Sequence, residues 1–372
     1  MRTLASHPAS QFMPPSQTSI SPDASGAALD AATGRRFTPA RAALWLSILA
    51  VALIATLLAS LAVGSSGVPL SDLLVAGAPS ESVAILWQVR LPRVLLAAAV
   101  GACLAAAGAC FQSLLRNPLA DPYILGISGG AGLGAIISGL LAPAAGLAVL
   151  MLRPTAAFIG SLAAVSLLLA LTRGTGRMLP ETMILMGVVI NATIMAAIMF
   201  IITVADFSRY QGTMYWLMGN LSSPTWPELA LVFGCLLPGA AALSLMGGTL
   251  NVLSGGEELA SQLGVNVPRA RLAVLCAASL ITAAAVSLAG LVGFVGLMIP
   301  HMGRLWLGPD NRLLVPASAL LGAIALVTAD TLARALFAPT QIPVGVITAL
   351  GGGPCFLWMF ARSRRRDLGQ GS

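Results

Sequence analysis

The chain has 372 residues, of which 57% are hydrophobic and only 9% are charged, and its mean hydropathy is +0.90. Soluble domains carry about 25% charged residues, so the composition excludes a soluble protein and predicts an all-α polytopic membrane protein. The formal net charge is +7, and all 20 basic residues are arginine. A phosphate-binding P-loop needs a lysine, so any ATP hydrolysis that drives this protein belongs to another chain.

Residues 1–37 are rich in Ser, Pro and Ala and show no periodic apolar face, which is typical of a disordered cytoplasmic tail. We expect a transmembrane domain over residues 38–366 and a short cytoplasmic C-terminal end over residues 367–372. The basic excess is better explained by positive charge kept on the cytoplasmic side of a membrane than by binding to nucleic acid.

A spanning helix needs about 20 apolar residues, and ten segments qualify as candidates. They are residues 42–63, 94–115, 123–141, 154–172, 183–204, 228–247, 270–288, 290–306, 313–333 and 343–361. The eighth is short and rich in glycine. Ten spans with a cytoplasmic N-terminus leave only Arg90, Arg93, Arg153, Arg209 and Arg334 outside. Without the eighth span the arginine-rich C-terminus would lie outside, against the positive-inside rule, so we predict ten spans and two cytoplasmic termini.

Residues 251–271 form the longest polar stretch between two apolar segments in the middle of the chain, and they predict a short helix outside the bilayer. Gly255 and Gly256 would end the preceding helix, because glycine is costly in a helix interior. Glu257 and Glu258 favour a new helix N-terminus.

The same short helix has a predicted end and a predicted apolar face. Gly264 is a typical C-cap, and Pro268 a typical first-turn residue of the next helix. Leu259 and Leu263 would share one face at the i, i+4 spacing. An ordinary capped loop between two spans is the alternative interpretation.

Glycines mark two further places in the apolar segments. Gly126, Gly130 and Gly134 recur every four residues, a spacing that favours close helix packing over a dinucleotide-binding loop. Residues 351–353 are all glycine and precede Pro354, which predicts a local break in the final span.

The fifth span is rich in methionine. Met183, Met186, Met195 and Met199 accompany Asn191, mostly at helical steps. Flexible thioethers suit a wide path for a bulky solute, although methionine also fills gaps in apolar cores. A buried amide such as Asn191 needs a partner or a pore.

Ionisable residues are almost absent from the spans. Asp330 and Arg334 are four residues apart and can pair along one helix. Asp330 is then the single candidate for an ion-coupling carboxylate, which makes a stand-alone secondary transporter the less favoured alternative. We find no catalytic triad, paired carboxylate or metal-ligand cluster, and we expect neither enzyme chemistry nor a metal site in this chain.

Three arginines fall on the outer side of the predicted membrane domain. Arg90, Arg93 and Arg334 would form an exposed positive surface there, which we interpret as a docking surface for an acidic partner. Anchoring to lipid headgroups is the alternative.

Five stretches of the sequence carry a combined pattern: RLPRVLLAAAVGACLAAAGACFQSLLRNPLADPYILGISGGAGLGA (90–135), WLMGNL (216–221), SGGEELASQLGV (254–265), AGLVGFVGLMIPHMGRLWLGPDNRLLVPASALLGAIALVTADTLAR (289–334) and IPVGVITALGGGP (342–354). Together they resemble the permease family of ABC importers for ferric siderophores, haem and cobalamin. The resemblance covers most of the chain beyond the tail.

The resemblance implies a type II ABC importer permease with ten helices per subunit. Its implied partners are a second permease copy in a homodimer, or sometimes a heterodimer, two cytoplasmic ATPase subunits that bind ATP and Mg, an external periplasmic substrate-binding protein and membrane lipid. It places the chain in the inner membrane. The cargo it implies is a bulky metal chelate, with ferric siderophore favoured over cobalamin and haem.

The resemblance also assigns roles to residues of this sequence. It makes the docking arginines contacts for the binding protein, and it makes the fifth span the lining of the pathway. The turn before that span, with Glu181 and Thr182, matches an inner gate approximately. The helix that docks into the ATPase would carry Glu257, Glu258, Leu259, Ala260, Leu263 and Gly264.

Overall fold

The computed structural model describes residues 37–63, 80–145, 149–174, 179–204, 211–222, 224–336 and 342–369. The predicted tail, apart from Phe37, and the last three residues lie outside these ranges. The described residues form helices and contain no strand, which confirms the all-α prediction.

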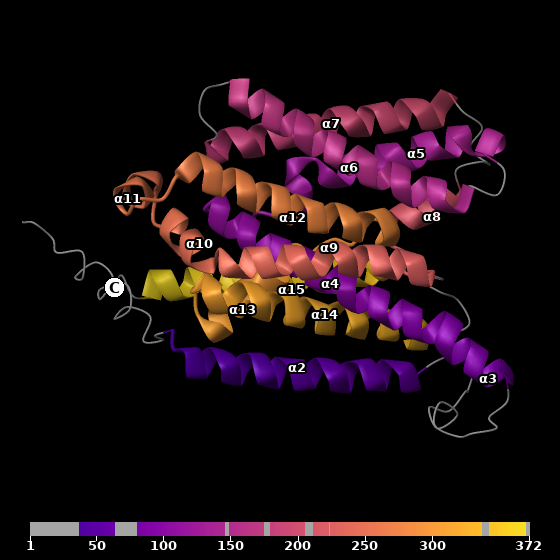
Figure 1. Ribbon diagram of the computed structural model, residues 1–372, viewed down its shortest axis with the longest axis horizontal. Helices are drawn as coiled ribbons and strands as arrows, with labels where there is room; N and C mark the ends of the chain where they lie inside the picture. Colours follow the sequence, from indigo (N-terminus) through magenta and orange to yellow (C-terminus); the bar gives the residue numbers. More distant parts are fainter. Residues whose placement is uncertain are drawn as a thin grey trace, which may run out of the picture. The chain divides into compact units, whose positions relative to one another are not determined.

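Figure 1 shows the helices in their order along the chain. Their bounds are α2 Pro39–Ala62, α3 Ser80–Ile85, η2 Leu86–Arg90, α4 Leu91–Leu114, η3 Pro122–Leu125, α5 Ile127–Ala145, α6 Val149–Gly174, α7 Pro180–Val204, α8 Gln211–Leu217, α9 Trp226–Leu245, α10 Gly247–Ser254, α11 Glu257–Gln262, α12 Val267–Ala289, α13 Val295–Leu307, α14 Asn311–Leu336 and α15 Val344–Gly369. Figure 1 shows α11 at one end of the long helices and α3 at the other. We call these the α11 end and the α3 end.

A helix occupies each of the ten predicted spans. Seven helices of the described chain are long and apolar enough to cross a membrane, and shorter apolar helices cover 127–140 and 344–359. The eighth is shorter than predicted: α13 has 13 residues, or about 20 Å at 1.5 Å per residue. Its N-terminal part is replaced by a non-helical segment, because Gly290 and Phe294 both adopt positive φ, 70° and 68°.

The central helix is α4, which is buried on nearly all sides and contacts α2, α9, α12, α13 and α14. Small residues along α4 allow this close packing. A Cβ added to Gly101 would collide with the carbonyl of Gly322 in α14, and one added to Gly108 would collide with the carbonyl of Gly296 in α13. Helices in lipid associate through such small-residue contacts, where backbones approach closely.

Glycines join α5 to α6 in the same way. Gly130 packs against the backbone of Gly160, and Gly134 packs against Ala156, which confirms the predicted packing role for these two. Gly126 differs, because it ends η3 in the left-handed region at φ 87° and does not lie within α5.

The predicted break in the final span is wrong. α15 continues without interruption through residues 351–354. Gly352 instead makes room for the neighbouring α13: a Cβ added there would lie 2.6 Å from Cβ of Phe294. Gly352 therefore serves a close contact with Phe294 rather than a local break, whereas a Cβ added to Gly351 would meet no atom within 4 Å.

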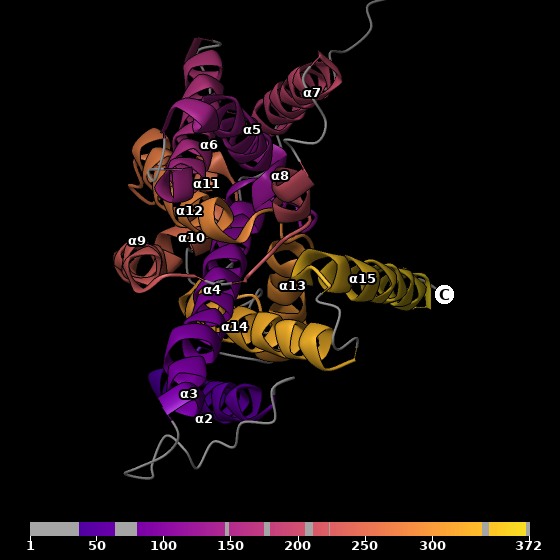
Figure 2. The same cartoon turned by 90° about the vertical axis from the view of Figure 1, so that its right-hand side faces the viewer.

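Large apolar side chains cover the outer faces of several helices, as expected for a surface in contact with lipid. α2 lies at the edge of the bundle (Figure 2) and exposes Leu44, Val51 and Ile54 by more than half. Trp87 and Trp226 are also about half exposed and lie with ring centroids 6.4 Å apart. Such tryptophans are typical of the interface between a membrane and water.

Candidate functional site

The short helix α11 has the boundaries that its glycines predict. Gly256 precedes it at φ 125°, a conformation accessible mainly to glycine. At its end, the N–H of Val265 donates to the carbonyl of Ala260 and the N–H of Gly264 donates to that of Ser261, both at 3.0 Å. This pair of hydrogen bonds, with Gly264 at φ 80°, is a Schellman C-cap. The capped-helix prediction is confirmed.

One face of α11 attaches the helix to the bundle. Ala260 is fully buried. The carboxylate of Glu257 accepts a 2.6 Å hydrogen bond from Nη2 of Arg271 at the start of α12, and lies 3.8 Å from Nη2 of Arg116 after α4. Among the six residues predicted to dock on an ATPase, Glu257 and Ala260 therefore anchor the helix, and Ala260 cannot reach a partner.

The opposite face of α11 is open. Leu259 is 40% exposed and Leu263 is 58% exposed, and Glu258 lies exposed beside them. Two exposed leucines on a helix outside the apolar spans are a typical signature of a protein contact. We call Glu258, Leu259 and Leu263 the exposed face of α11.

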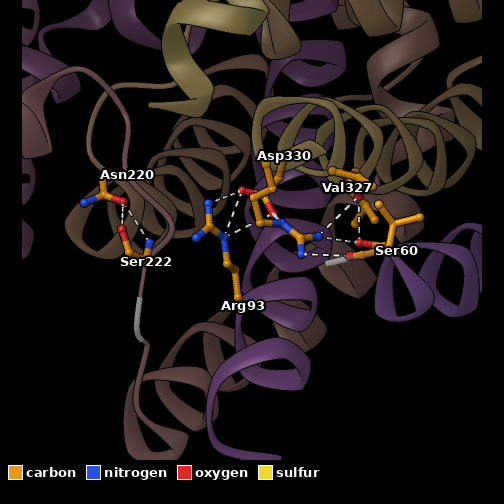
Figure 3. A network of polar contacts seen from close by, with 9 residues as sticks. Ser60, Arg93, Asn220, Ser222, Val327 and Asp330 are labelled. Atoms are coloured by element: carbon orange, nitrogen blue, oxygen red, sulfur yellow. Dashed lines mark hydrogen bonds and ion pairs between the residues drawn. The ribbon is translucent and has the colours of Figure 1, made fainter. Parts of the chain in front are cut away.

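At the α3 end, two of the predicted docking arginines share one buried carboxylate (Figure 3). Arg93 of α4 donates to Asp330 of α14 through Nη2 at 2.9 Å and through Nε at 3.1 Å. Arg334 donates to Oδ2 of the same carboxylate at 3.0 Å, and Nε of Arg93 also reaches this oxygen at 3.2 Å. Asp330 is 1% exposed. The predicted pair of Asp330 and Arg334 is confirmed, and Arg93 joins it from a distant part of the chain.

The same arginines also bind the carbonyls at the end of α2. Arg90 donates to the carbonyl of Leu61 at 3.0 Å, and Arg334 donates to that of Val63 at 3.2 Å. The last carbonyls of a helix lack partners within it, and arginines commonly bind them. The three arginines therefore hold α2, α4 and α14 together.

The expectation that these arginines are exposed is wrong. Arg90 and Arg93 are 5% and 8% exposed, and the side chain of Arg334 is 11% exposed. The physical reason is that Asp330 and the end of α2 supply them with partners inside the chain. Their docking to an acidic protein stays a prediction.

The methionines of α7 divide between two faces. Met183 is fully buried and Met186 packs against the core, whereas Met195 and Met199 are 39% and 63% exposed. Asn191 and Met195 line a shallow pocket of about 360 Å³, shared with Tyr123, Ile124, Val188 and Ala192. Met183 therefore cannot line a path, because its side chain reaches no surface. Half-buried Met186, Met195, Met199 and the edge of Asn191 remain candidates.

The side-chain amide of Asn191 lies at a close contact between α7 and α5. Its side-chain oxygen is buried without a hydrogen-bond partner among the described residues. It lies against Gly129 of α5, where an added Cβ would collide with it. The prediction that this amide needs a partner or a pore stays open.

Tyr123, beside this pocket, is a residue that sequence reasoning missed. Its hydroxyl donates to the carbonyl of Val292 at 3.0 Å and accepts from the N–H of Val292 at 2.9 Å. Val292 lies in the non-helical segment before α13. Irregular backbone within a membrane domain requires such internal partners. The available signal was a lone tyrosine in an apolar run.

The predicted inner gate lies in the first turn of α7. Glu181 is exposed and Thr182 is half-buried. Pro180 occupies the first helical position, where its missing N–H costs nothing. Nothing in this geometry tests a gate, so that role stays a prediction.

Comparison with known proteins now decides the family. Residues 52–362 match the FecCD transport family. The chain belongs to that family. It is 41% identical over 311 residues to the cobalamin import system permease protein BtuC of Halobacterium salinarum, covering 82% of each chain. It is 42% identical to the hemin transport system permease protein HmuU of Yersinia pestis, covering 76% of this chain and 85% of that one.

The solved structures agree with this family. An inward-facing conformation of a metal-chelate type ABC transporter superposes with a TM-score of 0.76 at 29% identity, covering 85% of this chain and 98% of that one. This FecCD family member is therefore a multi-pass transport permease of the inner membrane, and the predicted resemblance is confirmed.

Proposed function

We propose that this FecCD family member is the transmembrane subunit of a binding-protein-dependent ABC importer that moves a bulky metal chelate inward. The exposed face of α11 carries the proposal. A short helix anchored by Glu257 and Ala260 presents two leucines and a carboxylate away from the bundle. This arrangement suits a helix that docks into a groove of a separate ATPase.

The motor in this proposal lies on two partner chains. Without lysine, the permease lacks the P-loop cation that contacts nucleotide phosphates. ATP and Mg would bind the ATPase subunits, and the permease would hold no cofactor. Closure of the ATPases on ATP would displace α11, because nucleotide binds the two conformations with different affinities.

A second copy of the chain would complete the transport pathway. Large apolar side chains stay exposed on α7, including Val188, Met195 and Met199, and on α15, including Leu350 and Leu357. A homodimer that pairs these faces would enclose a path lined by methionine and other apolar side chains. Such a lining would hold its cargo weakly and release it readily.

The binding protein is proposed to dock at the α3 end. Arg90, Arg93 and Arg334 concentrate positive charge there. A summed charge steers an acidic partner even when single side chains are buried. In this topology the α3 end faces outward, and the α11 end and both termini face the cytoplasm.

A stand-alone secondary transporter is the second candidate, and the structure weakens it. Coupling to an ion requires a carboxylate that can release and accept that ion. Asp330, the candidate carboxylate, is already bound by Arg93 and Arg334. Both oxygens of this carboxylate accept hydrogen bonds from the two arginines, which suits a structural role.

Ferric siderophore is the proposed cargo, with cobalamin and haem as alternatives. The chain is 41% identical to a permease named for cobalamin and 42% identical to one named for hemin. Overall identity therefore does not discriminate between these cargoes, and selectivity is expected to lie mainly in the binding protein.

The test is uptake of labelled ferric siderophore, cobalamin and haem by cells with and without the gene, with the cognate ATPase and binding protein present. Loss of one chelate alone is the expected result and names the cargo. Co-purification of a P-loop ATPase is measured in parallel. Uptake that persists without any ATPase would overturn the importer proposal in favour of secondary transport.

A further inference from the structure

A chain of polar side chains runs from half-buried Asn251 of α10 to the buried side chains of Asn311, Ser113 and Gln112 in the bundle. Asn251, on the helix that leads directly into α11, donates to Oδ1 of Asp310 at 2.7 Å. Its own side-chain oxygen accepts from the backbone N–H of Asn311 at 2.8 Å and from Nδ2 of Asn311 at 2.9 Å. One amide therefore holds both residues at the start of α14.

Asp310 is the N-cap of α14. Its Oδ1 accepts from the N–H of Arg312 at 2.9 Å, and its carbonyl accepts from the N–H groups of Leu313 and Leu314. Asn251 binds the same carboxylate oxygen that caps the helix. A movement of α10 must therefore break this bond or carry the first turn of α14 with it.

Backbone packing joins the same two helices independently of Asn251. Gly247 lies one turn before Asn251 on α10, and a Cβ added there would lie 2.8 Å from Cα of Arg312 and 2.9 Å from its N. Two successive turns of α10 thus contact the start of α14, one through the backbone and one through hydrogen bonds.

The polar chain continues from α14 into α4 and α13. The hydroxyl of Ser113 lies 2.8 Å from Oδ1 of Asn311 and accepts from Arg304 at 3.1 Å. Arg304 also donates to Oε1 of Gln112 at 2.6 Å, and Gln112 donates to the carbonyl of Leu297 at 2.9 Å. Asn311, Gln112 and Ser113 are 2–4% exposed. These three side chains form the part of the network that is shielded from solvent, where hydrogen bonds strengthen one another.

We propose that Asn251 is the positioning residue that transmits the displacement of α11 to the transport pathway. The route passes from α10 to the first turn of α14, then through Ser113 of α4 and Arg304 to α13. α13 lies against α15 and follows the non-helical segment that Tyr123 binds. This inference rests on the proposed function, because it assumes that an ATPase moves α11.

The network is well placed for this role, since α11 is joined to α10 only by the turn at Gly255 and Gly256. Among the described residues, α11 forms ion pairs through Glu257, with Arg271 and Arg116. The side chain of Glu257 is 35% exposed, and the two pairs reach the end of α4 and the start of α12. Asn251 instead reaches Asn311, which is 2% exposed, and a lost hydrogen bond to a buried group is costly.

The first variant is Asn251→Ala in the complete transporter, made of permease, ATPase and binding protein in proteoliposomes. The probes are labelled ferric siderophore, cobalamin and haem, each with its own binding protein. We expect ATPase association and ATP hydrolysis to persist, whereas chelate imported per ATP falls about tenfold, in the range of typical coupling between sites. Thr38→Ala, which removes the N-cap of α2 at the same end, is the control and should leave the ratio unchanged.

A reciprocal exchange tests the specific pair. Asn251→Asp alone places two carboxylates together and should lower the ratio as well. Combined with Asp310→Asn, it restores one donor and one acceptor between the two positions, while the new amide oxygen can still cap α14. The double variant should regain most of the import per ATP. Amide hydrogen exchange of α13 with and without ATP gives a readout that needs no cargo. The change in exchange caused by ATP should be reduced in Asn251→Asp and should recover towards the wild-type value in the double variant.

The outcomes separate the two proposals. A wild-type permease that neither binds an ATPase nor imports any of the three chelates would overturn the proposed function. A working wild type, with Asn251→Ala importing as much chelate per ATP, would overturn the role of Asn251. So would a double variant no better than Asn251→Asp in both the import ratio and the exchange of α13.

Discussion

Arg93 and Asp330 are 237 residues apart in sequence, yet they form a buried ion pair with a 2.9 Å hydrogen bond, and Arg334 completes it from the next turn of α14. Two cations around one buried carboxylate tie the central helix to its neighbour. The pair explains why the arginines at the α3 end of the bundle need not be exposed.

Removal of this carboxylate should destabilise the fold. Asp330→Asn leaves Arg93 and Arg334 buried without their counter-ion, and breaking a buried pair in this way costs about 3–5 kcal/mol. Thermal unfolding in detergent should show a clear fall in the midpoint. The control is Glu228→Gln in the capping box of α9, which should cost far less. Equal midpoints for Asp330→Asn and wild type would show that the pair contributes nothing to stability.

The two faces of α11 should respond differently to substitution. Leu263→Ser on the exposed face should weaken association with the ATPase and leave thermal stability unchanged, because Leu263 is 58% exposed. Glu257→Gln should instead lower stability, because it removes the charge partner of Arg271. Pull-down and thermal unfolding of both variants give the comparison. Full ATPase association of Leu263→Ser would remove that leucine from the contact.

Backbone contact in the core makes Gly108 intolerant of any side chain. Gly108→Ala would drive a methyl group into the carbonyl of Gly296, and overpacking of this kind costs about 1–3 kcal/mol. Gly234→Ala is the matched control, because no atom lies within 4 Å of its added Cβ. Alanine in that helix should be neutral or stabilising by up to about 1 kcal/mol. Thermal unfolding that ranks the two variants in the opposite order would contradict the packing account.

Asp121, in the connection between α4 and η3, should make stability depend on pH. Burial raises the pKa of its carboxyl from 3.8 to about 6, partly opposed by the hydrogen bond from the N–H of Tyr123. The folded protein then holds a proton that the unfolded chain has released, so stability falls as pH rises between 3.8 and about 6. Unfolding midpoints across this window should fall for wild type.

Asp121→Asn provides the control for that pH dependence. Asparagine keeps an oxygen that can accept from the N–H of Tyr123, as N-cap asparagines do, but it does not titrate. The slope of the midpoint against pH should therefore flatten in this variant. An unchanged slope would assign the pH dependence to other groups.

Local sequence signals predicted several features correctly. Each of the ten predicted apolar segments contains a helix. Gly256 and Gly264 mark the start and the end of α11, because both adopt the positive φ that glycine accommodates. The pair Asp330 and Arg334 follows from the i, i+4 geometry of any helix. Each of these features depends on residues within one or two turns of each other, so the local sequence is enough to predict it.

Tertiary structure alone decided which face each side chain presents. The spans are apolar on all sides, so periodicity could not show that Met183 is buried while Met199 is 63% exposed. The presence of a glycine at position 352 could not show whether it breaks its helix or makes room for Phe294. The link of Asn251 to Asp310 spans 59 residues. The sequence by itself determined the helices and their ends, because backbone preferences are local; the arrangement of neighbours decided burial and pairing, because those depend on side chains far apart in the chain.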